Sequence, residues 1–198
     1  MKRGLFMEKV KFDFSPVEAE KILIEGNKRF VCGNLAFKNL SLDMRSELYN
    51  GQHPLAVVLT CSDSRVPPEL IFDQGLGDVF VIRNAGNVVS SIELGTIEYA
   101  LQILNVPLVV VLGHENCGAV KSAVDDGRGD SNIQSIIDNI IPSIKKVKLH
   151  NKNASNEKIA SLVEDENIFI DNQHLVICRN LPTKFRRKRL KGAVLKFP

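Results

Sequence analysis

Three side chains that could do chemistry follow one apolar run of the chain at alternate positions. Residues 55–59 are apolar, Thr60 ends the run, and Cys61, Asp63 and Arg65 come next. A short continuous apolar run is typical of a strand buried on both faces of a parallel sheet. Because open parallel sheets bind their ligands just beyond the carboxyl ends of the strands, this thiol, carboxylate and guanidinium are candidates for a functional site.

A second stretch repeats this construction. The apolar run 108–112 is followed by His114 and Cys117. If the two strand ends are neighbours, Cys61, His114 and Cys117 offer two thiolates and one imidazole, which suit zinc. Three protein ligands leave a fourth position open, as in catalytic zinc sites. Core filling is the simpler alternative for Cys61 taken alone, but the combination favours a functional site.

The carboxylate and the guanidinium are predicted to act as a pair. In a loop after a strand, the two-residue spacing of Asp63 and Arg65 permits a salt bridge that keeps the carboxylate ionised. An ordinary loop salt bridge is the alternative. Beside a predicted metal, the pair is interpreted as part of the chemistry.

The sequence resembles the beta-class carbonic anhydrases over roughly residues 15–150. The resemblance rests on Cys-Ser-Asp-Ser-Arg at 61–65, on Arg-Asn-Ala-Gly-Asn at 83–87 and on His-x-x-Cys at 114–117. It implies an enzyme that reversibly hydrates carbon dioxide to bicarbonate and a proton, with one Zn²⁺ per chain. The implied metal ligands are Cys61, His114 and Cys117, and the implied catalytic residues are Asp63 and Arg65.

Zinc chemistry sets an expectation for the pH dependence. Zinc lowers the pKa of a bound water from about 16 to about 7. Two thiolates donate more charge than imidazoles would and raise that pKa, so we expect higher activity above neutrality. In some members of the resembled family the residue that matches Asp63 occupies the fourth zinc position until it swings to the arginine. The sequence leaves both states open.

The resemblance also implies a substrate pocket. Gln52 matches a glutamine that hydrogen-bonds bicarbonate, Gly118 can present a backbone N–H to the product, and the pocket wall matches Phe80, Ala85 and Tyr99. Taken singly, Gln52 reads as an exposed loop residue, Phe80 as core and Tyr99 as a helix face. Their joint spacing favours the pocket.

The elements around these residues predict an α/β fold with a mainly parallel sheet. Strands are expected at about 55–60, 79–82 and 108–112, and strand order 2-1-3 would put the first and third carboxyl ends side by side at a switch point. Helices are expected at about 16–32, 67–72, 91–104, 117–124, 131–150 with a break at Pro142, and 157–175. Ser15 and Ser91 are the expected caps of the first and third helices.

Residues 1–50 are interpreted as an N-terminal helical arm. In the resembled family such helices pack on a neighbouring subunit, so we expect a homodimer or homotetramer. Residues 176–198 depart from the family, because its final strand with a Gly-x-x-Tyr-Asp-like segment is not found there. A basic cluster occupies this tail instead: Lys184, Arg186, Arg187, Lys188, Arg189 and Lys191. A solvated or disordered tail is the favoured interpretation, and a surface for an acidic partner is the alternative.

The length of 198 residues and an ordinary composition indicate a single domain over residues 1–198. The sheet of this domain is expected to be flanked by helices, and the resemblance implies that the domain binds zinc. A net charge of +3 is too small to indicate nucleic acid, and neither a signal peptide nor the ~20-residue apolar span of a membrane helix is recognised. Four cysteines without a framework spacing predict a reducing compartment, with cytoplasm as the default. Cys32 and Cys178 are interpreted as bystanders.

Two alternatives to carbon dioxide hydration remain. One is a zinc-stabilised protein that has lost activity through its altered tail, and the other is a hydrolase of CS2 or COS with the same fold and ligands. A redox role is disfavoured because Cys-x-x-Cys is absent, and no Gly-rich nucleotide signature follows a strand.

Overall fold

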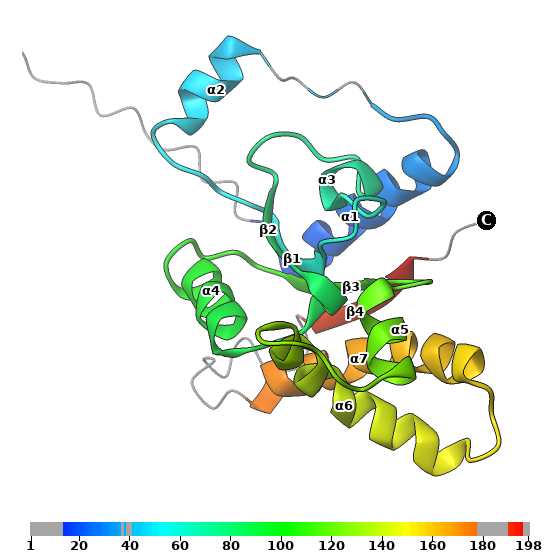
Figure 1. The fold of residues 1–198 in the computed structure, drawn as a ribbon. Coiled ribbons are helices and arrows are strands. Elements are labelled where there is room, and N and C mark those ends of the chain that lie inside the picture. Colours follow the sequence, from blue (N-terminus) through cyan, green and yellow to red (C-terminus); the bar gives the residue numbers. More distant parts are fainter. Residues whose placement is uncertain (1–13, 37, 39–40, 178–189, 196–198) are drawn as a thin grey trace, which may run out of the picture.

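The candidate residues lie on a sheet of four parallel strands in the computed structural model (Figure 1). The sheet order is β2–β1–β3–β4, with bounds β1 Ala56–Cys61, β2 Val79–Asn84, β3 Val109–His114 and β4 Leu190–Leu195. The structure describes residues 14–36, 38, 41–177 and 190–195. The predicted α/β class and the order 2-1-3 of the first three strands are confirmed.

The register of the strands brings their carboxyl ends together. Cys61 pairs with Asn84 of β2, and Thr60 pairs with Leu112 of β3. All six residues of β1 and all six of β3 are buried, as expected for central strands of a parallel sheet. Both strands extend past the apolar runs, so Cys61 and His114 are the last strand residues and not loop residues.

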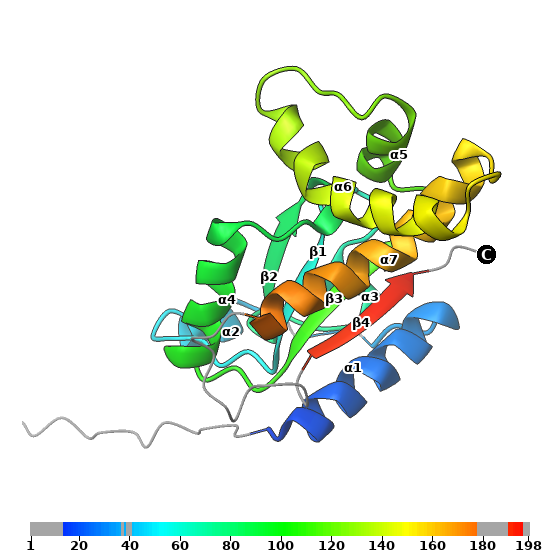
Figure 2. The same ribbon diagram turned by 90° about the horizontal axis from the view of Figure 1, so that it is seen from below.

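The two faces of the central strands pack in different clusters. Val57, Leu59, Val109 and Val111 pack with the α4 residues Ile97, Ala100 and Leu101, and with Ile168. Ala56, Val58, Val110 and Leu112 belong to a second cluster, which takes in residues of α1, α5, α6 and α7. The helices are α1 Pro16–Val31, α2 Leu42–Leu48, α3 Pro68–Ile71, α4 Ser91–Gln102, α5 Gly118–Asp125, α6 Ile133–His150 and α7 Asn156–Ile177, with a 3-10 turn η1 at Ala85–Asn87. Figure 2 shows α7 lying along β3 and β4.

Helix boundaries confirm one predicted cap and correct two details. Ser15 and Glu18 form the expected capping box of α1. Ser90, and not Ser91, caps α4, because Glu93 is correctly spaced to complete a box with Ser90. The predicted break at Pro142 is wrong, since α6 is continuous. Pro142 and Asp138 are exposed, so water can bind the carbonyl that the proline leaves without a donor.

The expectation of a tail without a strand is also wrong. Leu190–Leu195 forms β4, which pairs in parallel with β3 from Val109–Leu190 to His114–Leu195. Backbone N–H and C=O groups at the open side of β3 need partners, and β4 supplies them without the expected family segment. Lys191 lies in β4, whereas the other members of the basic cluster lie outside the described residues.

One face of α1 packs on its own chain. Ala19, Leu23 and Gly26 are buried, and the Asn27 side chain donates to the Ile71 carbonyl at 3.1 Å. Val17 and Val31 remain 74% and 72% exposed. Among the described helices, none has both the length and the apolar character needed to cross a membrane.

Candidate metal centre

Three potential ligands meet at the carboxyl ends of the two central strands. Cys61 ends β1, His114 ends β3, and Cys117 is the N-cap residue of α5. Their ligand atoms all lie within 4.8 Å of one another, and the two Sγ atoms are 4.0 Å apart. All three residues are buried. The topology thus assembles residues that are up to 56 positions apart in sequence.

The imidazole is oriented as a ligand would be. Its Nδ1 lies 2.9 Å from the Glu115 carbonyl oxygen, which can only accept, so Nδ1 carries the proton and Nε2 presents a lone pair. Nε2 is buried, and no atom of the described residues forms a hydrogen bond with it. A buried polar atom without a partner is costly, and a cation beside the two thiols would satisfy it. The donor set of His114, Cys61 and Cys117 therefore fits zinc.

The pKa values of the two thiols are shifted in opposite directions. The Cys117 thiol, placed to donate to the Cys61 sulfur, lowers the pKa of Cys61, and the Gly86 N–H at 3.3 Å from that sulfur has the same effect against the cost of burial. The same contact, together with burial, raises the pKa of Cys117. A metal ion removes this competition, because coordinated thiols are deprotonated.

A carboxylate borders this group and is held by a fork of donors. Nε and one terminal nitrogen of Arg65 each lie 2.9 Å from an oxygen of Asp63, and the Arg65 backbone N–H donates to the same carboxylate. This bidentate pair holds the pKa of Asp63 well below its usual range. Arg65 also donates to the Asn116 carbonyl at 3.1 Å, which ties the two strand-end loops together. Asp63 Oδ2 is 4.0 Å from His114 Nε2.

Arg83 fixes the backbone of the same loop. Its guanidinium donates to the carbonyl oxygens of Cys61 at 2.9 Å and Asp63 at 2.6 Å. Arg83 therefore bridges β2 and the loop that carries the candidate ligand and the carboxylate.

The structure brings only some of the predicted pocket residues to this group. Ala85 is next to Gly86, whose N–H reaches the Cys61 sulfur, and Gly118 directly follows Cys117. Phe80 pairs with Val57, four residues before Cys61, which is about 13 Å along the strand.

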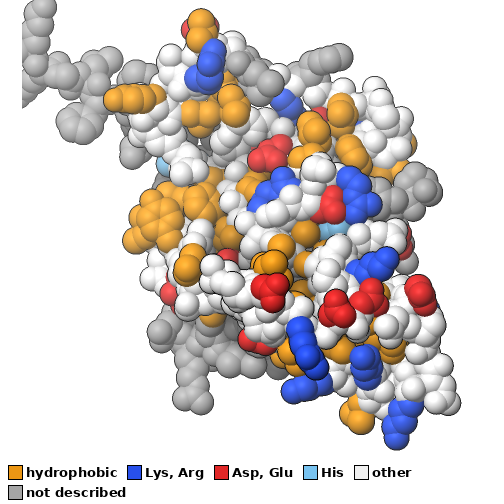
Figure 3. All heavy atoms as spheres, viewed as in Figure 1, with side chains coloured by type: hydrophobic (Ala, Val, Ile, Leu, Met, Phe, Trp, Pro, Cys, Tyr) orange, Lys and Arg blue, Asp and Glu red, His pale blue; other side chains and the backbone are white. Residues whose placement is uncertain are grey.

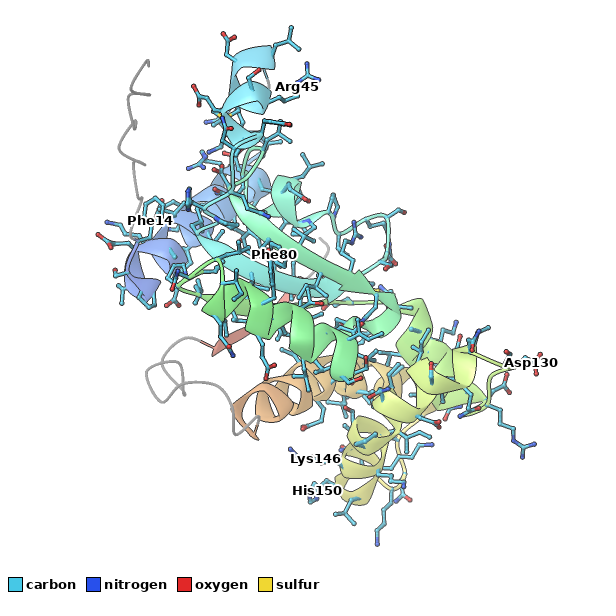
Figure 4. The ribbon with its side chains drawn as sticks, turned by 90° about the vertical axis from the view of Figure 1, so that its left-hand side faces the viewer. Phe14, Arg45, Phe80, Asp130, Lys146 and His150 are labelled. Carbon is cyan, nitrogen blue, oxygen red and sulfur yellow. The ribbon has the colours of Figure 1, made fainter. Side chains whose placement is uncertain are left out.

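Tyr99 and Gln52, two other predicted pocket residues, also lie away from the candidate ligands. Figure 4 shows Phe80 part-way along the strands beside α4, and its ring centroid is 6.3 Å from that of Tyr99. Gln52 is exposed in the loop that enters β1, at the opposite end of that strand. Within one chain, Gln52, Phe80 and Tyr99 do not join the metal group.

Sequence reasoning missed two buried polar residues of α7. Glu164 accepts the Cys117 backbone N–H at 2.8 Å, and Asn167 donates to the Gly86 carbonyl at 2.9 Å. Burial raises the pKa of Glu164. The available signal was a pair of polar residues, three positions apart, on a helix face otherwise formed by Val163 and Ile168.

Fold and site together define a parallel α/β protein with a buried Cys-His-Cys group, and comparison with known proteins identifies its family. Residues 56–196 match the profile of the carbonic anhydrase family. Carbonic anhydrase 2 of Mycobacterium tuberculosis is 50% identical over 134 residues, which cover 66% of this chain and 65% of that protein.

Solved structures agree. The beta-carbonic anhydrase CcaA has a TM-score of 0.72 at 29% identity and covers 89% of this chain and 83% of its own. A tetrameric beta-carbonic anhydrase from Sordaria macrospora has a TM-score of 0.64 at 28% identity, with 77% and 80% covered. The chain belongs to the beta-carbonic anhydrase family. The region similar to the mycobacterial relative spans slightly less than two thirds of that protein's length.

Proposed function

We propose that this chain is a zinc enzyme that reversibly hydrates carbon dioxide to bicarbonate and a proton. One observation carries the proposal: Cys61, His114 and Cys117 converge within 4.8 Å, beside an Asp63 carboxylate that Arg65 holds in place. The mycobacterial relative named carbonic anhydrase supports the same reaction.

In this proposal Cys61, His114 and Cys117 hold one Zn²⁺ per chain. Zinc in such a site supplies a nucleophile at neutral pH, because it lowers the pKa of water. Asp63 stays ionised through its contact with Arg65 and accepts a hydrogen bond from the attacking water, which aims the oxygen lone pair at carbon dioxide. Gly118 offers its backbone N–H to the product. The observed contact of Asp63 with Arg65 supports a resting state in which this carboxylate would not be a metal ligand.

A second copy of the chain would complete the substrate pocket. Gln52, Phe80 and Tyr99 are implied pocket residues that lie away from the metal group of their own chain. Ile92 and Tyr99 of α4 and its C-cap residue Ile103 are apolar and are 75%, 48% and 65% exposed. Figure 3 shows hydrophobic side chains gathered on the side of the molecule where α4 and β2 lie. A surface of this kind suits an isologous contact between copies.

We place the protein in the cytoplasm. Cys61 and Cys117 are free thiols with sulfur atoms 4.0 Å apart, and both are needed as thiolates for the metal. A reducing compartment keeps such a pair available.

Stopped-flow measurement of carbon dioxide hydration, with zinc quantified on the same sample, tests the proposal. We expect about one zinc per chain and a rate that rises between about pH 7 and about pH 8.5. Cys61→Ser should lose both metal and activity, whereas Asp63→Ala should keep the metal and lose activity. Stoichiometric zinc without turnover at either pH would contradict the proposal and indicate a non-catalytic relative.

A further inference from the structure

We propose that helix α7 positions both thiolate ligands of the metal centre, through the side chains of Glu164 and Asn167. The inference rests on the proposed function only in that Cys61, His114 and Cys117 hold the metal. It assigns a role to two residues that lie 47 and 81 positions from the backbone groups they contact.

Glu164 fixes the backbone of one ligand. Its Oε1 accepts the Cys117 N–H at 2.8 Å, and the residue is only 8% exposed. Cys117 is the N-cap residue of α5, and its side chain makes no capping hydrogen bond with the helix. The carboxylate from α7 therefore orients the peptide that precedes the Cys117 side chain.

Asn167 fixes the other ligand through Gly86. Its amide nitrogen donates to the Gly86 carbonyl at 2.9 Å, and the Gly86 N–H points to the Cys61 sulfur at 3.3 Å. Gly86 has φ of 76°, so this conformation strongly favours glycine. The Asn167 side chain is held in turn, because its oxygen accepts from the buried Ser143 hydroxyl at 3.0 Å. A buried chain of contacts thus runs from α6 through α7 to Cys61.

The packing of α7 sets how closely these groups approach the site. Glu164 and Asn167 are three residues apart, which places them on one helix face. Gly113, the residue before His114, lies against Ile168 of the same helix: a Cβ at Gly113 would be 2.5 Å from Ile168 Cδ1. The glycine allows the helix to approach the strand end closely enough for both polar side chains to reach their partners.

Burying polar groups at these positions costs desolvation free energy, which apolar side chains would avoid. A buried carboxylate loses hydration, and Val163 and Ile168 show that apolar residues pack well on the same face. Glu164 contacts the backbone of a candidate ligand, Cys117. Asn167 contacts the backbone of Gly86, whose N–H lies against the sulfur of Cys61. Partners of this kind orient metal ligands, and their loss typically weakens metal binding by about 10–100-fold.

Zinc affinity, measured by competition with a chelator, tests the inference. Glu164→Asp keeps the charge but withdraws the acceptor by one methylene, whereas Glu164→Gln keeps an acceptor at full reach and removes the charge. We expect Glu164→Asp and Asn167→Leu to bind zinc about 10–100-fold more weakly than the parent, and Glu164→Gln to stay within a few-fold of it. Val163→Ala is the matched control, because it removes buried volume from α7 without touching a ligand contact.

Two readouts besides turnover separate positioning from general stability. The rise in melting temperature on adding zinc to the metal-free protein should shrink in Glu164→Asp and Asn167→Leu but not in Val163→Ala. Thiolate-to-cobalt charge-transfer absorption of the Co²⁺-loaded variants should weaken or shift in the same two. Parent-like affinity in both polar variants, or an equal loss in Val163→Ala or Glu164→Gln, would overturn the inference. A loaded parent without carbon dioxide turnover would instead overturn the proposed function while the affinity result stands.

Discussion

At the scale of single residues, the Asp63–Arg65 pair leads to a specific prediction for catalysis. The two Arg65 nitrogens hold the Asp63 carboxylate 4.0 Å from His114 Nε2 and keep it ionised. Such a group can accept a hydrogen bond from a nucleophile but contributes nothing to holding the metal in this conformation. Activity and metal content should therefore respond differently to its removal.

Asp63→Asn should lower kcat/KM for carbon dioxide hydration by about 100-fold or more while the zinc content stays at the parent level. The amide keeps the size of the side chain but loses the charge that accepts the hydrogen bond and pairs with Arg65. Steady-state stopped-flow assays and metal analysis on the same preparations provide the check. The neighbouring exposed Ser64→Ala is the control, and a less than threefold effect of Asp63→Asn would contradict the assigned role.

Asp73 supports a prediction on stability and pH. Burial favours the neutral acid, but the Arg29 guanidinium at 2.5 Å and the Ala36 N–H at 3.1 Å outweigh it, so the pKa of Asp73 lies below its ordinary value. A carboxyl with a depressed folded-state pKa contributes stability above its unfolded pKa of about 4 and loses it as the pH falls through the folded value.

Asp73→Asn should therefore lower the free energy of unfolding by about 1–3 kcal/mol at neutral pH, with a smaller difference near pH 3.5. Urea unfolding of the metal-free proteins measures this without interference from protons that compete for the thiolates. A gap between parent and variant that is the same at both pH values would show that the charge of Asp73 does not contribute.

The candidate ligands could be predicted from sequence, whereas their supports could not. Cys61, His114 and Cys117 follow apolar runs at recognisable spacings, and the parallel topology brings such strand ends together. Glu164 and Asn167 contact backbone N–H and C=O groups 47 and 81 residues away. The polar pair on an apolar helix face could have marked Glu164 and Asn167 as candidates. Because their partners are backbone groups, which every residue type carries, only the structure could reveal the contacts.

At the scale of elements, strands buried on both faces were predicted well because their apolar runs are continuous. Two errors have a shared cause, since tertiary packing overrode a local signal. α6 continues through Pro142 because Ile137, Ile140, Ile144 and Val147 anchor it on the core. Leu190–Leu195 becomes a strand because β3 offers an open side for pairing, although the segment includes Lys191 of the basic cluster.

Helix α1 provides a test at this scale. A Cβ on Gly26 would lie 1.8 Å from the Phe72 carbonyl oxygen, and backbone cannot move aside as a flexible side chain can. We expect Gly26→Ala to lower the free energy of unfolding by about 1–3 kcal/mol, although alanine is the better helix former. Glu25→Ala on the exposed side of α1 should change it by no more than about 0.5 kcal/mol. A stabilised Gly26→Ala variant in urea unfolding would show that α1 does not pack on its own chain in solution.

At the scale of the whole molecule, the proposed site is divided between the two ends of the strands. The metal group and Asp63 lie at the carboxyl ends, whereas Gln52 precedes β1 and Phe80 lies about 13 Å back along β2. If all of them serve one reaction, they must meet across a contact between copies. Each site would then combine the metal group of one chain with Gln52 of another.

Co-expression of two defective variants tests this arrangement. Cys61→Ser removes a metal ligand and Gln52→Ala removes the proposed substrate contact, so each variant alone should have little activity. In mixed dimers one of the two sites receives both intact halves, and random pairing should restore about a quarter of the parent activity. Co-expression of Cys61→Ser with Asp63→Ala is the matched control, because both defects lie in the same half and every site keeps one of them. Recovery in the first mixture but not in the second would establish a shared site, and equal absence of recovery would confine catalysis to residues of a single chain.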